Sequence, residues 1–359
     1  ILNSYLPWSA SGCNDCIIST LEGCKGLLSR LVRKFFEIQS DVTDASGRVN
    51  FQEFLQHCDF LELEEAICEL QGADLASALV DDTERTAFAI NLHNLCLRLA
   101  FLKLGVPASN ESRQTYLSNV KIQVSSGVLS LQDLASGALR GEQKSKTGSG
   151  GQSSSGKNDK RSRVPSDKRV HFALYRGGTK AGCCPIGTFS ADNLSEELQI
   201  AAEAFCEREA NVSLDVKQNV VKLGKSLEWF AKDYSLSHAQ LLKQLLGYLR
   251  GEKKETLEKM FPRKPKVVFE PYDWQVHALH CLEFNPILLK ANIKGRRNPG
   301  LRLQGILPTK SNSGRRPRSF PNFSSTPSGF APKSSTTNAT DKTTSSNISK
   351  STTDVGFYM

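Results

Sequence analysis

The sequence predicts an α+β fold: a mostly helical single domain packed on a small, largely antiparallel sheet, with a disordered insertion and a disordered tail. Three observations support this class. Apolar residues recur at helical spacing in several segments, and short alternating segments are separated by helices and include one hairpin pattern. Two polar stretches also lack the apolar residues that a core needs. This pattern favours α+β over a doubly wound sheet.

Composition divides the 359 residues into three parts. We expect 1–27 to be a weakly ordered N-terminal segment, 28–284 the domain, and 285–359 a basic, Ser/Thr-rich disordered tail. Within the domain, 142–166 is rich in Ser, Gly and Lys and reads as a flexible insertion. The tail holds 12 Lys and Arg and two Asp, a net charge of +10, whereas the whole chain is +9. Residues 1–284 therefore sum to −1, which argues against nucleic-acid binding by the folded domain.

Helices dominate the first part of the domain. Apolar residues at i, i+3 and i+4 predict a helix near 26–37. The clearest pattern lies at 83–104, which is apolar on nearly all sides, as a buried helix is, and which Gly105 and Pro107 close. Ser130 and Asp133 form a capping box that opens a short helix ending at Gly141.

The second part of the domain is predicted to contain strands as well as helices. Val170, Phe172 and Leu174 alternate with other residues and predict a strand over 170–175, followed by a Gly-rich loop. The remaining pattern predicts a helix at 193–209, two short strands around a turn within 211–223, helices at 224–234 and 237–251, and a last strand within 264–274.

Membrane and redox signals point to a cytoplasmic protein. No run of about 18 consecutive apolar residues occurs, so no transmembrane segment is predicted. The ten cysteines show no closely spaced framework, and several lie in helical apolar patterns, where cysteine acts as a small hydrophobe. These features favour a reducing compartment. No cofactor and no metal site is expected.

Two motifs resemble metal sites. Val42–Glu53 matches a calcium-binding EF-hand loop at several positions, but Val42 stands where the first ligand, an Asp, belongs. The alternative is an ordinary glycine turn between helices. Cys13 and Cys16 could form half of a zinc site, but no second pair lies nearby, which favours free thiols.

A polar stripe follows one side of the apolar helix 83–104. Asn91, Asn94 and Arg98 are spaced i, i+3 and i+7. A buried amide or guanidinium left without a partner costs about 1–3 kcal/mol or more, so each needs one. The stripe either braces neighbouring backbone or lines a polar pocket together with Arg140 and His171.

His171 and Cys184 are the candidate catalytic residues. A thiolate beside an imidazole is the arrangement of cysteine nucleophiles, and Cys184 lies in the loop that follows the His171 segment. Asn94 or Asp273 would orient the imidazole; Asp273 could instead approach Arg140 or cap a turn. The competing interpretation is that His171 is a satisfied core residue.

Four blocks, taken in order, resemble the plant and algal family called domain of unknown function 547. They are ERTAFAINLHNLCLRLAFLKLG at 84–105, LSLQDLASGALRG at 129–141, DKRVHFAL with its Gly-rich loop and Cys184-Pro185, and FEPYDW at 269–274. LEWFAKDY at 227–234 fits between the last two, and the similarity covers roughly 28–278. The resemblance implies a fold unit and no established reaction. His93 stands where the family usually has Tyr, and Arg176 where many members have Cys.

Two functions are consistent with these residues. The first is a non-catalytic interaction or scaffold module with protein partners, in which the polar core is structural. The second is a thiol-dependent or hydrolase-like enzyme that uses His171 and Cys184. Arg176, in place of the family's cysteine, favours the first.

Overall fold

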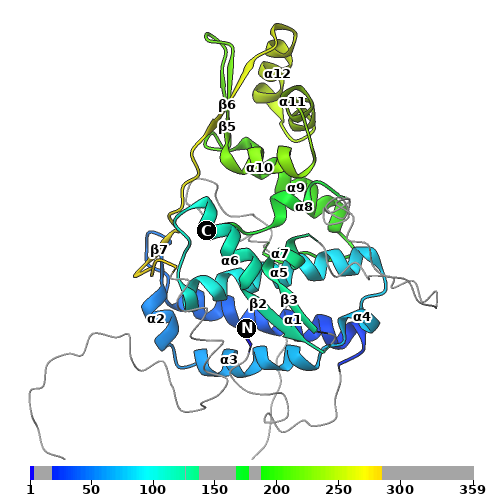
Figure 1. The fold of residues 1–359 in the computed structure, drawn as a ribbon, viewed down its shortest axis with the longest axis vertical. Coiled ribbons are helices and arrows are strands. Elements are labelled where there is room, and N and C mark those ends of the chain that lie inside the picture. The colour runs from blue at the N-terminus through cyan, green and yellow to red at the C-terminus, as the bar shows by residue number, and fades with distance from the viewer. Residues whose placement is uncertain (4–17, 126, 137–166, 178–186, 285–359) are drawn as a thin grey trace, which may run out of the picture. The chain divides into compact units, whose positions relative to one another are not determined.

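The structure is a computed structural model that describes residues 1–3, 18–125, 127–136, 167–177 and 187–284 (Figure 1). The predicted insertion at 142–166 and the predicted tail at 285–359 lie outside these residues, as do Cys13, Cys16 and Arg140. The domain limits at 28 and 284 therefore stay a prediction. Helix α1 begins at Leu21.

The described elements are mostly helices, joined by short strands. In order they are α1 (Leu21–Asp41), β1 (Val49–Asn50), α2 (Phe51–Gln56), α3 (Phe60–Cys68), η2 (Glu69–Gly72), α4 (Leu75–Ala78), α5 (Asp82–Leu104), α6 (Asn110–Asn119), β2 (Lys121–Val124), β3 (Gly127–Ser130), α7 (Leu131–Ala135), α8 (Val170–Ala173), α9 (Leu194–Glu207), β4 (Val212–Asp215), β5 (Val220–Gly224), α10 (Lys225–Asp233), α11 (His238–Leu246), α12 (Gly251–Met260), η4 (Phe261–Arg263), β6 (Lys266–Glu270) and β7 (Ala278–Leu279).

The strands form small sheets of two or three strands, and the predicted α+β class is confirmed. β4 and β5 make the predicted hairpin, and β6 pairs parallel to β5. β2 and β3 pair antiparallel. β1 pairs parallel with β7, which joins residues near position 50 to residues near position 280.

Helix α5 has well-defined ends. Its N-terminus is capped by the Asp81 carboxylate, which accepts hydrogen bonds from the backbone N–H groups of Thr83 and Glu84. Its C-terminus stops at Gly105, whose φ of +85° disfavours residues with a Cβ. A Cβ there would also lie 2.7 Å from the carbonyl oxygen of Leu282. Gly105 therefore ends the helix as predicted and admits the chain that returns near residue 282.

Most of α5 is buried among other elements, as predicted. By length and composition α5 is apolar enough to cross a membrane, and 78% of its most apolar stretch is buried inside the protein. An apolar surface on nearly all sides is what a core helix requires, because neighbours cover every face.

Three clusters of buried apolar side chains make up the described core. The first packs α5 with α1, α3, α6 and α7. The second fills the space between the β4–β5–β6 sheet and helices α10, α11 and α12. The third lies between α5, α8 and α9. Phe172 belongs to the second cluster, whereas Val170 and Ala173 belong to the third, so the α8 segment connects the two.

The predicted strand over 170–175 is wrong, because residues Val170–Ala173 form the helical turn α8. Every residue from Val170 to Leu174 is buried. The apolar residues therefore do not distinguish the spacing of a helix from the alternation of a strand. Asp167 supplies the missed signal: its carboxylate accepts a hydrogen bond from the backbone N–H of Arg169, a local contact that favours a turn.

We expect Tyr116→Phe to raise the free energy of unfolding by about 1 kcal/mol. Tyr116 is fully buried, and among the described residues its hydroxyl has no hydrogen-bond partner. Such a group carries a desolvation penalty that Phe lacks. Urea denaturation followed by circular dichroism measures the change.

Tyr248→Phe is the matched control. Tyr248 is also buried, but its hydroxyl accepts a hydrogen bond from Gln244 Nε2 at 2.9 Å. Removing that bond should lower the free energy of unfolding by about 1 kcal/mol. Equal destabilisation by both substitutions would contradict the interpretation of Tyr116.

Candidate functional site

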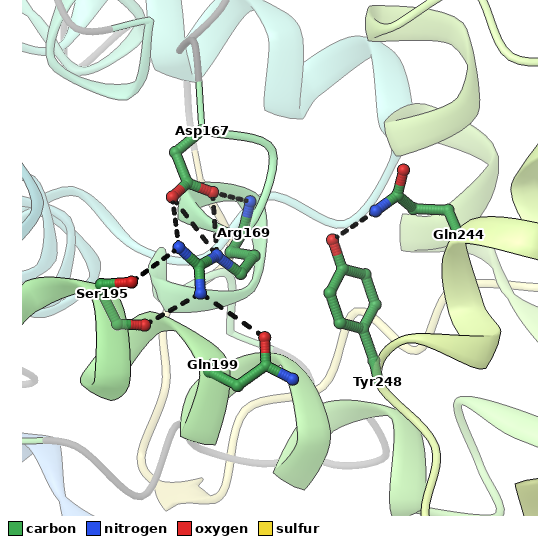
Figure 2. Close-up of polar contacts among 6 residues, drawn as sticks. All are labelled: Asp167, Arg169, Ser195, Gln199, Gln244 and Tyr248. Carbon is green, nitrogen blue, oxygen red and sulfur yellow. Dashed lines mark hydrogen bonds and ion pairs between the residues drawn. The ribbon is translucent and has the colours of Figure 1, made fainter.

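The α8 turn is fastened to helix α9 by Arg169. The Asp167 carboxylate pairs with the Arg169 guanidinium, with a shortest N–O distance of 2.7 Å. The same guanidinium donates to the backbone carbonyl and the hydroxyl of Ser195 and reaches Gln199 Oε1 (Figure 2). Because one planar group makes all these contacts, α8 is held rigidly against the start of α9.

His171 lies inside the protein. Its imidazole Nε2 donates a hydrogen bond to the backbone carbonyl of Ser226 at 3.0 Å, which fixes a proton on that nitrogen. The rings of Phe172 and Phe230 lie edge-on to it, 5.5 and 5.0 Å away between centroids. Burial, and then the positive charge of Arg176, holds the pKa of His171 well below its ordinary value. The imidazole is therefore neutral at pH 7.

Asn94 binds the main chain immediately after α8. Its Nδ2 donates to the carbonyl of Ala173 at 3.0 Å, and its Oδ1 accepts from the backbone N–H of Tyr175 at 2.7 Å. Tyr175 thus pairs with a side chain where an extended residue would pair with a neighbouring strand. The amide satisfies two main-chain groups of a segment that has no sheet partner among the described residues.

Asn91, one turn earlier on α5, also binds main-chain groups with both ends of its amide. Its Nδ2 donates to the carbonyl of Phe189, and its Oδ1 accepts from the N–H of that residue, both at 2.8 Å. Asn91 and Asn94 therefore pin both ends of the loop between Tyr175 and Phe189 to one side of α5. Cys184 belongs to this loop and lies outside the described residues.

Arg140, one of the predicted pocket residues, lies outside the described residues, so the predicted polar pocket stays a prediction. Arg98 lines a pocket on α5, but the described lining includes neither Asn91, Asn94 nor His171. The His171 imidazole hydrogen-bonds to Ser226 and not to Asn94. The Asp273 carboxylate accepts from the backbone N–H of Gln275 at 3.1 Å, a turn-capping contact.

Tyr272 binds the main chain directly after Tyr175. Its hydroxyl lies 2.7 Å from the carbonyl oxygen of Gly177 and 3.1 Å from that of Arg176. Gly177 has a φ of +67°, and a Cβ on it would lie 2.9 Å from the ring of Phe101. Gly177 therefore allows the main chain to approach the Phe101 ring closely.

Four partly exposed side chains beside this segment form what we call the aromatic–arginine patch. Trp229 of α10 contacts Tyr272 at 5.0 Å between ring centroids, and Tyr272 contacts Trp274 at 4.8 Å. The Arg113 guanidinium of α6 lies 4.3 Å from the centre of the Trp229 ring. No sequence pattern indicated this set, although LEWFAKDY and FEPYDW contain three of its members.

Positive charge accumulates behind the patch. The Arg176 guanidinium donates to the backbone carbonyl of His171 at 3.0 Å. Burial, reinforced by the charge of Arg176, lowers the pKa of Arg113 to about 10, so Arg113 stays charged at neutral pH. Asp233 lies nearby, and burial raises the pKa of its carboxyl. The arginines are thus satisfied mainly by ring faces and carbonyl oxygens.

The EF-hand-like loop between α1 and α2 is closed by a side chain. Asp44 accepts hydrogen bonds from Ser46 and from the backbone N–H and guanidinium of Arg48. These hydrogen bonds hold the pKa of Asp44 well below its ordinary value. Gly47 makes the turn at φ +78°. The Arg48 guanidinium therefore binds the Asp44 carboxylate, which a calcium ion would need as a ligand.

A second group with metal-ligand atoms lies before α3. Donor atoms of His57, Cys58 and Asp59 lie within 4.8 Å of one another. His57 Nδ1 accepts from the backbone N–H of Asp59, and its Nε2 lies 3.4 Å from Asp41. Both imidazole nitrogens are already engaged, so this group fits a surface turn better than a metal site.

Residues 77–206 match the family model described as "Protein of unknown function, DUF547". The predicted resemblance is thereby confirmed over this range, which contains α5, α8, Asn91, Asn94 and His171. The matched region of the chain is an uncharacterised domain. No curated protein and no solved structure matches the chain.

We expect Asn94→Ala to lower the free energy of unfolding by about 2–4 kcal/mol. The substitution leaves the carbonyl of Ala173 and the N–H of Tyr175 without their partner. Asn119→Ala is the control, since its amide bonds to its own exposed helix and should cost under about 0.5 kcal/mol. Urea denaturation of both variants gives the values; equal costs would contradict the bracing role.

Acid should destabilise the protein through its buried histidines. Burial lowers the pKa of His93 to about 4, whereas an unfolded histidine titrates near 6.5. Between these values only the unfolded state binds the proton, so stability falls as the pH falls. At pH 5 His93 should cost about 2 kcal/mol relative to pH 7. His93→Tyr should reduce the measured loss by that amount; an unchanged pH profile would contradict it.

Proposed function

We propose that this chain is a non-catalytic interaction module of the cytoplasm whose partners are proteins. The proposal rests on one observation: the polar side chains of the core bond to the protein's own main chain. Both amide groups of Asn91 and Asn94 bond to main chain, and the His171 Nε2 proton bonds to Ser226. A catalytic site would present such groups to a substrate. Here they hold the fold.

The aromatic–arginine patch supports protein binding. Trp, Tyr and Arg are the residues most enriched where binding energy concentrates in protein interfaces. Arg113, Trp229, Tyr272 and Trp274 are all partly exposed, and contacts among them pre-order the side chains. Because these side chains are already ordered, covering the patch with a partner costs this protein little side-chain entropy.

Charge and thiols support the remaining parts of the proposal. Residues 1–284 carry a net charge of −1, so protein partners suit the folded domain better than nucleic acid. Cys24, Cys58, Cys96, Cys206 and Cys281 are free thiols. Free thiols are typical of a reducing compartment such as the cytoplasm.

Site-specific photo-crosslinking tests the module. The full chain carries benzoylphenylalanine at position 274 within the patch, or at the exposed position Val216 as the matched control. After irradiation in extract of the source cells, we expect one defined adduct from position 274 and none from 216. Arg113→Met should weaken the adduct, because it removes the cation that orders Trp229.

Cys184→Ser separates the module from a thiol enzyme. The adduct at position 274 should survive this substitution. The rate of Cys184 alkylation, followed by mass spectrometry, should rise with a midpoint near the ordinary thiol pKa of about 8.5. A midpoint below pH 7 that shifts in His171→Gln would instead support a thiolate paired with an imidazole, and the non-catalytic proposal would fail.

A further inference from the structure

A pocket beside α5 is independent of the aromatic–arginine patch. Its volume is about 80 Å³, and part of it is open to solvent. Its apolar wall includes Phe35, Phe54, Phe101 and Leu102, which are all buried. Arg98 and Tyr175 complete the wall, and we call this the Arg98 pocket.

The walls of the Arg98 pocket come from segments that are fixed elsewhere. Phe35 belongs to α1, Phe54 to α2 and Phe101 to α5, and the three helices share one buried cluster. The β1–β7 pairing holds the remaining wall at Val49 and Ala278. The cavity is therefore preformed, so a ligand need not order it on binding.

Arg98 brings an unbalanced positive charge to this apolar cavity. Its guanidinium carbon lies 4.0 Å from the ring centre of Tyr175 and 5.3 Å from that of Phe36. In the described chain it forms no ion pair, and its guanidinium donates no hydrogen bond to another side chain or to main chain. The ring faces orient the guanidinium but supply no anion, so its N–H donors remain available.

We propose that the Arg98 pocket binds a small carboxylic acid with an apolar body. The carboxylate accepts paired hydrogen bonds from the planar Arg98 guanidinium, and the apolar body lies against the phenylalanine rings. A guanidinium matches the two oxygens of a carboxylate in geometry as well as in charge.

A singly charged ligand fits better than a phosphate. Among the described lining residues Arg98 is the one Lys or Arg. His277 also lines the pocket, but its Nε2 bonds to the carbonyl of Ser46 at 2.9 Å. A phosphate would bring nearly two negative charges and three strong acceptors into an apolar wall with one cation. A monocarboxylate brings one charge, which Arg98 neutralises.

Calorimetric titration with two matched probes tests the proposal. Phenylacetate supplies a carboxylate on an apolar ring, and phenylacetamide has the same shape without the charge. We expect the full-length protein, in a buffer free of carboxylates, to bind phenylacetate at least about tenfold more tightly. Arg98→Met keeps the length of the side chain and should abolish the preference. Arg33→Met, on the exposed face of α1, should leave it intact.

Other results would overturn the proposal. Equal affinity for the two probes, or an unchanged preference in Arg98→Met, would show that Arg98 does not select a carboxylate. No binding of phenylacetate at millimolar concentration would show that the cavity takes no such ligand. If Arg98→Met fails to fold, Ala278→Phe, which fills the cavity from β7, should abolish phenylacetate binding while the protein melts cooperatively. Retained binding in Ala278→Phe would place phenylacetate outside the pocket. The crosslinking at position 274 uses other residues, so the two proposals can fail separately.

Discussion

The two asparagine amides on one side of α5 are the contacts on which the rest of this structure depends. α5 is buried and apolar on nearly all sides, so any chain that crosses it loses water as a hydrogen-bond partner. Asn91 and Asn94 replace that water at Phe189 and at the Ala173–Tyr175 segment. A leucine at either position would preserve the apolar surface and leave main-chain groups unpaired.

The segment pinned by Asn94 brings distant parts of the sequence together. His171 reaches α10 through the carbonyl of Ser226, and Tyr272 reaches back to Gly177 from the chain after β6. The α8 turn also contributes apolar side chains to two core clusters. Segments that are far apart in the sequence therefore meet around residues 170–177. This convergence explains why a helical turn, which offers side chains in all directions, replaces the expected strand.

Among the described residues, three arginines of this region, Arg98, Arg113 and Arg176, form no ion pair with a carboxylate. Arg113 lies on an indole, Arg98 on a phenol ring, and Arg176 donates to a carbonyl. Burial, and then the positive charge of Arg113 and Arg176, favours the neutral forms of His93 and His171. The same arrangement leaves guanidinium groups near partly exposed surface, where the proposed protein partner or acidic ligand would supply an anion. Polar groups inside the fold thus serve stability, and both proposals assign recognition to those at its edge.

Local pattern was sufficient for the parts of this protein that depend on neighbours in sequence. The burial of α5, its stop at Gly105, the Ser130–Asp133 capping box and the β4–β5 hairpin all follow from spacing and turn chemistry. The polar stripe was also recognisable, because amides on an apolar helix need partners. Only the tertiary structure decided which partners they take. The residues from Val170 to Leu174 are buried on every side, so their pattern carries no period. The pairing of Tyr272 with Gly177, the indole under Arg113 and the cavity beside Arg98 each join segments tens of residues apart, and such contacts leave no local trace in the sequence.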